Sequence, residues 1–544
     1  MTEHLTTMTQ TIQICMAQLN LKVGDLDNNT QHIIETIETA RDELKADIVL
    51  FPELAVTGYL PEDLLLRDDF MTKTAEAVHA ITAACTGIEV ILSYPKRDNG
   101  KLMNASAWIR NKEIIAEHFK AQLPNLGLLD EKRYFKRGNQ TTLVQYKGIT
   151  FGLLICEDLW HEEPIAQASA AGAQCILSPN ASPFHSEKLS IRNQLLQNHA
   201  HHHKTSIIYV NTVSGQDEFL FDGQSTAIDR DGSVAAKAPA FREALLMVEL
   251  KPDATVVHQP LEEQPLEALI YEGLVLATRD YIRKNGFFGA IIGLSGGIDS
   301  ALTLAIAVDA LGAENVHAVM MPSQYTASIS LEDAKAQAQT MRTQYDIVPI
   351  KLIYESFMQE LNPLFSGYQP DITEENLQSR IRGTLLMALS NKTRKLVLAT
   401  GNKSEMATGY TTLYGDMAGG FSVLKDVYKT MVYALARYRN TISLVIPERV
   451  ITRPPSAELA PDQLDQDSLP PYEVLDVIIK GFVEDDLSVD AIVAQGFDEA
   501  TVRKVIQLIQ RNEYKRRQSA PGIRVTRRAF GRNRRYPMTS GFKY

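Results

Sequence analysis

The sequence contains few cysteines and no long apolar run. Its 544 residues include four cysteines, at positions 15, 85, 156 and 175, too few for a disulfide framework or a clustered zinc site. A reducing compartment such as the cytoplasm fits this usage. No apolar stretch is long enough to cross a bilayer, and the polar residues Met1 to Gln10 lack the apolar core of a signal peptide. We therefore expect a cytoplasmic protein with no membrane partner.

The chain also lacks an excess of positive charge. Its net charge of −11 argues against a general binder of nucleic acids or anionic membranes. One segment, Arg511 to Arg535, is strongly basic and has two interpretations: an arm that binds nucleic acid, or a surface that partly neutralises a substrate carrying phosphates. The negative charge of the remainder favours the second. The length of the chain predicts two or more domains.

Apolar strand patterns alternate with helical patterns in the first half, which predicts an α/β domain whose sheets are covered by helices. The expected strands are 12–18, 48–52, 89–93, 106–110, 150–156, 175–178, 207–212 and 225–228, and the expected helices are 28–44 and 187–203. A polar, proline-bearing stretch at 250–265 interrupts the pattern. We therefore expect a first domain at 1–262 and a second at 263–544.

The second half alternates again, with a helix expected at 266–284 and strands at 290–294, 316–321, 347–351 and 395–400. This alternation predicts a doubly wound parallel sheet, which binds ligands at the carboxyl ends of its strands. The first strand ends in the segment Gly293-Leu294-Ser295-Gly296-Gly297-Ile298-Asp299-Ser300. Its glycines allow a tight turn and close approach to a ligand, and free N–H groups at a helix start attract phosphate.

This loop has no lysine, so it differs from the loop that serves γ-phosphoryl transfer. An ordinary turn of small residues is the alternative, but the position of the segment between two apolar runs favours a phosphate loop. Its Ser-Gly-Gly-Ile-Asp-Ser order resembles the pyrophosphate loop of the N-type ATP pyrophosphatases. That resemblance implies cleavage of ATP to AMP and pyrophosphate in order to activate an acid. Asp299 is expected to hold Mg²⁺ against the phosphates.

Glu53, Lys120 and Cys156 each follow an apolar strand of the first half. A cysteine nucleophile needs a base and a group that stabilises charge on the attacked carbonyl, and a carboxylate and an ammonium supply these needs. Taken singly, the three residues have ordinary explanations as a helix cap, a surface charge and an inert buried thiol. Together with their proline-bearing flanks they resemble the nitrilase superfamily, whose domains cleave amide C–N bonds.

This resemblance covers about the first half of the chain and implies an α-β-β-α sandwich. It implies that Cys156 is the nucleophile, Glu53 the general base and Lys120 the stabiliser of the transition state. The segment 180–184 with its following lysine resembles the part of glutaminase members that holds the amino-acid end of glutamine. Leu126 stands where the family usually has tyrosine, which leaves only a backbone contact there. The residues expected to contact glutamine are Leu126, Glu157, Trp160, Ser182 and Lys188.

Further motifs of the second half select among the ATP pyrophosphatases. They lie at 375–382, 398–405, 414–421, 425–429, 453–459, 465–470 and 514–517. As a set they resemble the NAD synthetase family, and the whole chain resembles its glutamine-dependent members. The resemblance implies that the loop 293–300 and Thr400 contact ATP, and that Glu405 shares Mg²⁺ with Asp299. It also implies that the dinucleotide substrate, nicotinic acid adenine dinucleotide, is contacted by Asn376, Arg380, Glu405, Lys425 and Lys515.

These residues also have ordinary explanations, because Glu405 could cap a helix and Lys425 and Lys515 could be solvated surface charges. The reaction implied is the amidation of the dinucleotide acid to NAD⁺ through an adenylate, with ammonia from glutamine hydrolysis and release of AMP, pyrophosphate and glutamate. Mg²⁺ with ATP is expected, without a tightly bound prosthetic group. The partners expected are small molecules and further copies of the chain in a homodimer or larger homo-oligomer.

Three other functions are compatible with parts of the sequence. They are an amide-forming ligase of the same ATP class that uses a different acid, a nucleic-acid-modifying enzyme that uses the basic segment, and an interaction protein that has lost its activities. The consecutive histidines His201 to His203 raise the question of a metal site. Because no carboxylate or cysteine is spaced with them along the chain, we expect them to lie on a helix without a metal.

Overall fold

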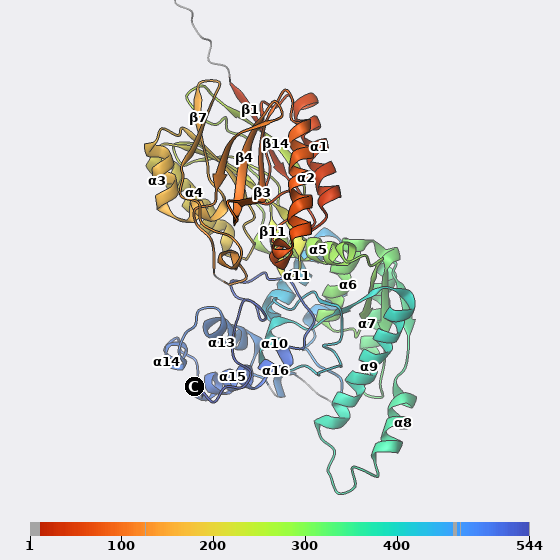
Figure 1. The fold of residues 1–544 in the computed structure, drawn as a ribbon. Coiled ribbons are helices and arrows are strands. Elements are labelled where there is room, and N and C mark those ends of the chain that lie inside the picture. Colours follow the sequence, from red (N-terminus) through yellow and green to blue (C-terminus); the bar gives the residue numbers. More distant parts are fainter. Residues whose placement is uncertain (1–10, 126, 461–464, 468, 543) are drawn as a thin grey trace, which may run out of the picture. The chain divides into compact units, whose positions relative to one another are not determined.

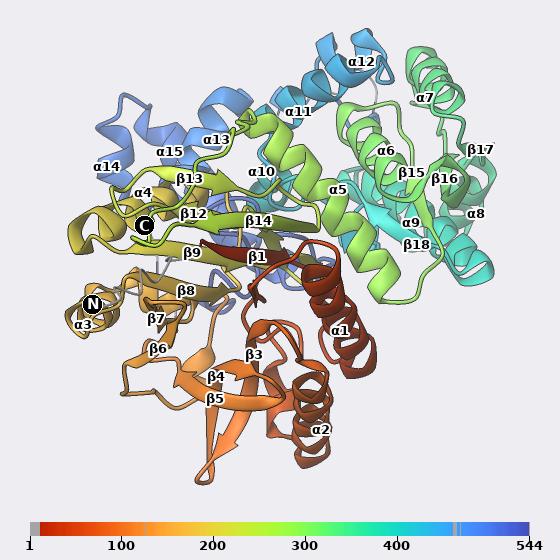
Figure 2. The ribbon, with the colours of Figure 1, turned by 90° about the horizontal axis from the view of Figure 1, so that it is seen from above.

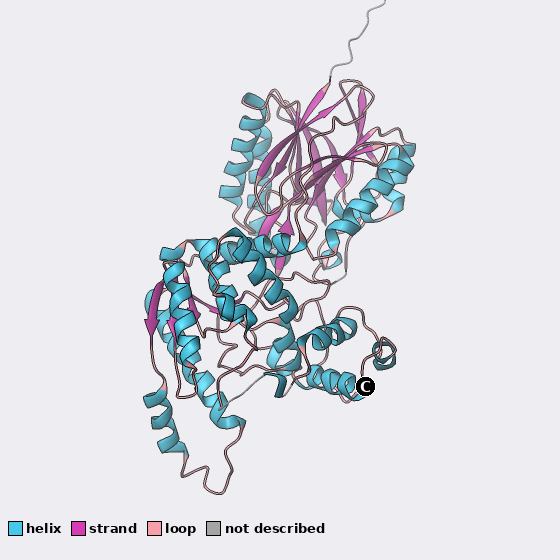
Figure 3. Cartoon of the chain, turned by 180° about the vertical axis from the view of Figure 1, so that it is seen from behind, coloured by secondary structure: helices cyan, strands magenta, loops and turns pink. Residues whose placement is uncertain are grey.

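The structure is a computed structural model that describes residues 11–125, 127–460, 465–467, 469–542 and 544. The chain divides into two compact units, each of which mixes helices and strands (Figure 3). The first unit extends to Gln216 and includes Leu220–Glu263, while the second consists of Asp217–Phe219 and the residues from Gln264 onward. Among the described residues, no helix has the length and apolar character needed to cross a membrane.

The first unit contains two six-stranded sheets and a two-stranded hairpin. The order of the first sheet is β14-β1-β2-β3-β4-β5, formed by β1 (Ile12–Gln18), β2 (Ile48–Leu50), β3 (Glu89–Asp98), β4 (Lys101–Arg110), β5 (Glu113–Phe119) and β14 (Ala244–Leu250). The order of the second is β13-β12-β9-β8-β7-β6, formed by β6 (Thr142–Tyr146), β7 (Ile149–Leu153), β8 (Cys175–Asn180), β9 (Ser206–Asn211), β12 (Thr226–Ile228) and β13 (Val234–Lys237). The hairpin is β10 (Val213–Gln216) with β11 (Phe219–Asp222).

Apolar side chains from the two sheets meet in one buried cluster, so the sheets pack face to face (Figure 2). Trp108 of the first sheet contacts Phe151 of the second, with ring centroids 5.5 Å apart. Helices lie on both outer faces (Figure 1): α1 (Leu26–Asp42) and α2 (Asp68–Ala84) on the first sheet, α3 (Glu162–Ala170) and α4 (Lys188–His203) on the second. The expected α-β-β-α sandwich is therefore confirmed. Three 3₁₀ helices complete the unit, η1 (Glu62–Leu66), η2 (Glu131–Arg133) and η3 (Cys156–Trp160).

The inner strands of both sheets run parallel, β1 with β2 and β3 in one sheet and β7 with β8 and β9 in the other. Their carboxyl ends therefore gather at one edge of each sheet. A hydrogen bond joins the two edges, because the backbone N–H of Glu53 after β2 donates to the carbonyl oxygen of Asn180 at the end of β8 (3.3 Å). Polar residues that follow these strands are thus brought together across the sandwich.

The second unit is built on a parallel sheet of order β17-β16-β15-β18-β19, which confirms the doubly wound arrangement. Helix α9 packs against one face of this sheet, and α6, with α5 and α11 beside it, covers the other (Figure 2). The strands are β15 (Ala290–Gly293), β16 (Val316–Met320), β17 (Gln344–Ile347), β18 (Leu396–Ala399) and β19 (Phe421–Ser422). The helices are α5 (Leu266–Lys284), α6 (Ile298–Leu311), η4 (Ala313–Asn315), α7 (Ser328–Thr340), α8 (Lys351–Leu361), α9 (Ile372–Thr393), α10 (Lys403–Thr408), α11 (Lys429–Ile442), α12 (Glu448–Thr452), η5 (Asp465–Asp467), α13 (Tyr472–Val483), α14 (Val489–Val493), α15 (Glu499–Arg511) and α16 (Glu513–Arg516).

One expected strand is displaced. The apolar run 347–351 suggested a strand, but β17 is Gln344–Ile347 and Lys351 already begins α8. Pro349 has no backbone N–H to donate to a neighbouring strand, which disfavours a strand at 347–351. The strand that forms instead is a largely exposed edge strand, and its mostly polar residues do not show the apolar pattern from which strands are predicted.

The basic segment 511–535 is largely paired within the second unit. The buried guanidinium of Arg516 bonds the Glu513 carboxylate (2.8 Å) and the carbonyl oxygen of Ala407 (2.8 Å). Arg528 bonds Asp486 at 2.6 Å, and the Arg534 guanidinium lies 3.3 Å from Glu513. These three arginines are therefore paired with groups of the second unit itself. The expectation that the basic segment neutralises substrate phosphates is not supported for them.

Candidate active sites

The Lys120 ammonium and the Glu53 carboxylate form a buried ion pair in the first unit. Lys120 follows β5 and Glu53 follows β2, and the Lys120 Nζ lies 2.6 Å from the Glu53 Oε1. Both side chains are fully buried. Glu53 also accepts from the Asn104 side-chain amide (2.8 Å) and from the backbone N–H of Ala181 (3.1 Å). Three donors thus fix the orientation of this carboxylate.

The charges of Glu53 and Lys120 both act on the Cys156 thiol. Burial, and next the Glu53 carboxylate, raise the pKa of the Cys156 thiol well above its usual value, whereas the Lys120 ammonium acts in the opposite direction. The resting thiol is therefore protonated, and its attack on a carbonyl requires a base. Cys156 also has a φ of +43° at the start of η3, a left-handed conformation that is strained for a residue with a Cβ and that occurs often at functional sites.

The turn that carries Cys156 is tied to the loop that carries Lys120. The buried carboxylate of Asp158 in η3 accepts from the backbone N–H groups of Ile155 (2.9 Å), Ala121 (2.9 Å) and Gln122 (2.7 Å). One side chain thus fixes the positions of both reactive groups, a positioning role that sequence reasoning did not predict.

A second buried acid belongs to this site. Glu131 in η2 accepts from the Lys120 ammonium (2.8 Å) and from the Tyr59 hydroxyl (2.7 Å) through the same oxygen, Oε1. Burial raises the pKa of Glu131 to about 7, against the opposing effect of Lys120. Sequence reasoning missed Glu131 because it follows no strand and lies eleven residues from its partner within a long loop.

The residues expected to contact glutamine surround the same edge. The Lys188 ammonium, at the first residue of α4, lies 3.4 Å from the ring centroid of Trp160 in η3. Glu157 lies in the same short helix, and Ser182 follows Ala181, with its backbone N–H bonded to the Asn211 side chain (2.8 Å). Leu126 lies outside the described residues. Glu157 and Trp160 thus share the short helix that begins at Cys156, Lys188 contacts Trp160, and Ser182 follows the residue whose backbone N–H bonds Glu53.

The glycine loop of the second unit connects β15 to α6 in a tight turn. Gly296 has a φ of +82°, and a Cβ at this position would lie 2.4 Å from the carbonyl oxygen of Ser330. The hydroxyls of Ser295 and Ser300 lie 3.0 Å apart, and the Ser295 hydroxyl accepts from the Gly297 N–H (3.2 Å). Only glycine fits at position 296, and the loop is held compactly around the start of the helix.

A cavity opens at the carboxyl ends of β15 and β18, as the doubly wound sheet predicts. Its lining includes Thr400, Glu405 and every residue of the loop 293–300 except Gly296. Among the described residues, three cationic side chains also line it, Arg382, Lys429 and Arg453. All three lie within the motifs at 375–382, 425–429 and 453–459, but none of them was expected to contact a substrate. Arg453 donates to the carbonyl oxygen of Gly296 (3.0 Å), and Arg382 to that of Met321 (2.9 Å). The two arginines therefore fix backbone around the cavity.

Lys429 joins the two carboxylates that were expected to hold Mg²⁺. Its ammonium bonds the Asp299 carboxylate and lies 3.2 Å from the Glu405 Oε1. Burial raises the pKa of Glu405 to about 8, although Lys429 lowers it. Asn402 completes the arrangement, with its side-chain amide 2.8 Å from Asp299 and its backbone N–H 3.3 Å from Glu405. The two carboxylates converge on one cation, and carboxylate oxygens are ligands that Mg²⁺ prefers, so these residues fit the ion.

Lys425 lies elsewhere. Its buried ammonium donates to the carbonyl oxygen of Ala520 (2.7 Å), and burial lowers its pKa. It does not line the cavity, so the expectation that Lys425 contacts the dinucleotide gains no support from the geometry. Lys429, four residues later at the start of α11, holds the position at the cavity.

The other residues expected to meet the dinucleotide contact one segment, 409–416, part of which lines the cavity. The side-chain Oδ1 of Asn376 accepts from the Thr412 hydroxyl (2.8 Å), and Arg380 donates to the backbone carbonyl oxygen of Leu413 (3.2 Å). The Lys515 ammonium bonds the carbonyl oxygens of Gly409 and Thr411, both at 2.8 Å. None of the three lines the cavity itself, so in this structure they support the segment that does.

Comparison with known proteins gives matches to both units. A carbon–nitrogen hydrolase family model matches residues 13–257, and an NAD synthase model matches residues 270–519. The chain is 48% identical to the glutamine-dependent NAD(+) synthetase of Acinetobacter baylyi, covering 98% of this chain and 99% of that protein. It is 42% identical to that of Aquifex aeolicus, covering 98% and 100%. A solved structure of the enzyme from Acinetobacter baumannii, in complex with ADP, matches 97% of this chain and 98% of that one with a TM-score of 0.80 and 47% identity.

The raised pKa of Glu131 predicts a pH dependence of stability. An acid whose pKa rises from 4.5 to about 7 on folding stabilises the fold fully below pH 4.5, and this contribution is lost as the pH rises through about 7. Glu131→Gln keeps the shape without titrating. We therefore expect the melting temperature of E131Q to rise relative to that of the native chain between pH 5 and 7.5, measured by scanning calorimetry. If the melting temperatures of E131Q and the native chain changed in parallel across this pH range, Glu131 would not have a raised pKa in the folded state.

Proposed function

This chain belongs to the glutamine-dependent NAD(+) synthetases, and from this membership we propose how its own residues amidate nicotinic acid adenine dinucleotide with nitrogen from glutamine. The observation that carries the proposal is the convergence of Glu53 and Lys120 with the strained Cys156 in one unit, while a phosphate loop and two carboxylates line one cavity in the other. We assign residues 1–262 to the glutaminase domain and 263–544 to the synthetase domain.

In the glutaminase domain, the Cys156 sulfur attacks the side-chain amide of glutamine. The thiol is protonated at rest because burial raises its pKa, so the proton must leave as the bond to carbon forms. The Glu53 carboxylate, fixed by three donors, accepts it and passes it to the departing ammonia. The Lys120 ammonium supplies positive charge beside the developing oxyanion. Water activated by Glu53 then hydrolyses the thioester to glutamate.

The amino-acid end of glutamine is proposed to lie over η3 and the start of α4. A zwitterionic end needs charges of both signs, and Glu157 in η3 and Lys188 at the start of α4 supply them. The contact of Lys188 with the Trp160 ring (3.4 Å) keeps its ammonium in a defined place. Ser182 adds a hydroxyl next to the Ala181 N–H that holds Glu53. We retain Leu126 as a proposed backbone contact.

In the synthetase domain, ATP is proposed to bind in the cavity with its phosphates on the loop 293–300 and on Thr400. The start of α6 offers free N–H groups and the positive end of the helix dipole. Asp299 and Glu405 are the residues that would hold Mg²⁺, which when bound neutralises phosphate charge. The carboxylate of the dinucleotide attacks the α-phosphorus of ATP and displaces pyrophosphate, which gives an acyl adenylate. Ammonia then attacks the acyl carbon of this adenylate to give NAD⁺, and AMP leaves.

We propose that Asn376, Arg380 and Lys515 act on the dinucleotide largely through the segment 409–416 that they hold. Tyr410, Thr412, Gly415 and Asp416 of that segment line the cavity, so the position of the segment determines the shape of the site. The proposed assembly is a homodimer or larger homo-oligomer. The relatives named above also argue against a different acid and against a nucleic-acid substrate.

The division of labour predicts a selective defect for Cys156→Ala. Without the thiol no thioester forms, so NAD⁺ formation from glutamine should fall below detection, while formation from ammonium should stay within about twofold of the native rate. The measurement is NAD⁺ yield by chromatography with each nitrogen source. Cys85→Ala is the matched control, because Cys85 is also a buried thiol and its sulfur donates to the Ile81 carbonyl oxygen of α2 (3.1 Å), away from the ion pair of Glu53 and Lys120. Loss of both activities in a folded C156A variant would contradict the scheme.

Lys429, at the start of α11, and Lys425, four residues before it, should differ in their importance for catalysis. Lys429→Met removes the cation between Asp299 and Glu405, and we expect kcat/KM for ATP with ammonium to fall about 100-fold or more. Lys425→Met removes a charge of the same kind outside the cavity and should retain kcat/KM within about tenfold. Melting curves first confirm that both variants fold. Steady-state kinetics then shows which of the two lysines the synthetase reaction requires. A larger loss for K425M would restore the assignment expected from the sequence.

A further inference from the structure

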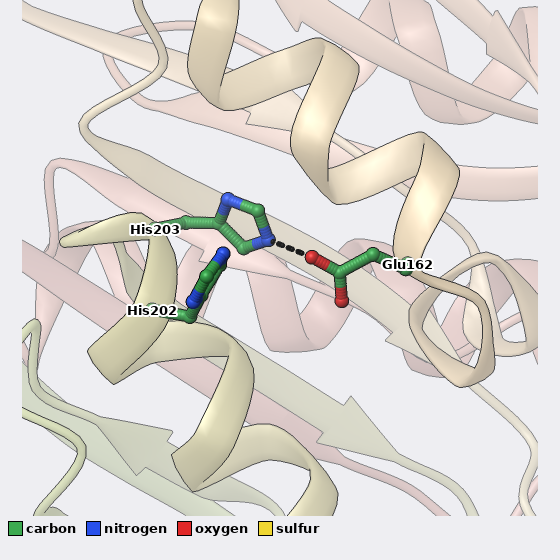
Figure 4. A group of neighbouring side chains, drawn as sticks. All are labelled: Glu162, His202 and His203. Atoms are coloured by element: carbon green, nitrogen blue, oxygen red, sulfur yellow. Dashed lines mark hydrogen bonds and ion pairs between the residues drawn. The ribbon is translucent and has the colours of Figure 1, made fainter.

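A cluster of imidazoles and one carboxylate lies on the surface of the first unit, where the start of α3 meets the end of α4 (Figure 4). The His203 Nε2 lies 2.8 Å from the Glu162 Oε1. His202 lies beside them, with its ring centroid 4.8 Å from that of His203 and its plane nearly perpendicular. The nitrogen and oxygen atoms offered by Glu162, His202 and His203 all lie within 4.8 Å of one another.

We propose that Glu162, His202 and His203 form a binding site for a divalent transition-metal ion of the Zn²⁺ class. Two imidazoles and a carboxylate are ligands that Zn²⁺ takes at about 2.0–2.2 Å. Tetrahedral ligand atoms at that distance lie about 3.3 Å apart, so the three groups need only small side-chain rotations. Glu162 and His202 are exposed and free to make them. This site is independent of the residues assigned to glutamine, ATP and Mg²⁺.

The surroundings of the cluster favour a cation. The histidines occupy the last turn of α4, where the helix dipole and unpaired carbonyl groups attract positive charge. His199, one turn earlier, places its Nδ1 3.2 Å from the second oxygen of Glu162. Its other nitrogen, Nε2, lies 3.0 Å from the carbonyl oxygen of Leu159. His199 thus supports the carboxylate from behind, as partners of metal ligands commonly do.

The metal site proposed here lies next to η3, the short helix that begins at Cys156. Glu162 begins α3 directly after η3, which starts at Cys156, and His199 contacts the Leu159 carbonyl within η3. An ion held by Glu162, His202 and His203 therefore connects the end of this turn to α4. We expect metal binding to raise the melting temperature of the chain, because an ion that binds only the folded state stabilises it by mass action.

The ligand set also predicts which ions bind. Imidazole nitrogen suits Zn²⁺, Ni²⁺ and Cu²⁺, whereas Mg²⁺ prefers an all-oxygen octahedron. The test is a Zn²⁺ titration of the full, untagged chain by calorimetry, with excess Mg²⁺ present to occupy the acidic residues of the synthetase cavity. Co²⁺ in place of Zn²⁺ reports the coordination geometry through its visible absorption.

Neighbouring residues of the same type provide matched controls. His201 is exposed, and its ring bonds the carbonyl oxygen of Asp231 (2.9 Å), while Glu163 accepts from Gln167 (3.2 Å). We expect His203→Ala and Glu162→Gln to weaken Zn²⁺ binding about 100-fold or more, since even changes to outer partners of metal ligands cost about 10–100-fold. His201→Ala and Glu163→Gln should stay within about threefold of the native chain. Zn²⁺ should raise the melting temperature of the controls and leave that of H203A unchanged.

The opposite pattern would overturn the proposal. If H201A lost as much affinity as H203A, or E163Q as much as E162Q, the binding would be non-specific association with surface histidines and acids. Displacement of Zn²⁺ by an equal concentration of Mg²⁺ would also exclude an imidazole site. All four positions lie in exposed or half-exposed places on α3 and α4, and melting curves recorded without metal separate loss of binding from loss of fold.

Discussion

A buried lysine ammonium shared by two carboxylates lies at the centre of each candidate active site. Lys120 bridges Glu53 and Glu131 in the first unit, and Lys429 bridges Asp299 and Glu405 in the second. A buried ammonium is costly unless carboxylates lie at close range to it. The close distances within both clusters therefore depend on fixed positions of the strand ends and helix starts that carry these side chains.

The same clusters explain the chemistry. Burial raises the pKa of one acid of each pair, Glu131 to about 7 and Glu405 to about 8, which places their protonation near neutral pH. In the first unit the Lys120 ammonium lies beside Glu53 and opposes the rise in the pKa of the Cys156 thiol, the two groups proposed as base and nucleophile. In the second unit the Lys429 ammonium lies between Asp299 and Glu405, the carboxylates proposed to hold Mg²⁺.

Residues that follow strands could be predicted from the sequence, and residues positioned by loops or by distant contacts could not. Parallel strands bring their carboxyl ends together, so Glu53, Lys120 and the glycine loop were found without a structure. Glu131 was missed because it lies within a loop, and Lys429 because its distance of four residues from Lys425 gave no reason to prefer it. The partner of His203, Glu162, lies 41 residues away along the chain, which explains why the histidines alone predicted no metal.

The central claim is that nitrogen released at Cys156 becomes the amide nitrogen of NAD⁺. The most direct test supplies ATP, Mg²⁺, nicotinic acid adenine dinucleotide and glutamine labelled with ¹⁵N in its side-chain amide, without added ammonium. Mass spectrometry then reads the label in the nicotinamide carboxamide. The account predicts that the NAD⁺ formed carries ¹⁵N and that glutamate forms with it in at least equal amount. Glutamate formed without labelled NAD⁺, or NAD⁺ formed without the label, would contradict it.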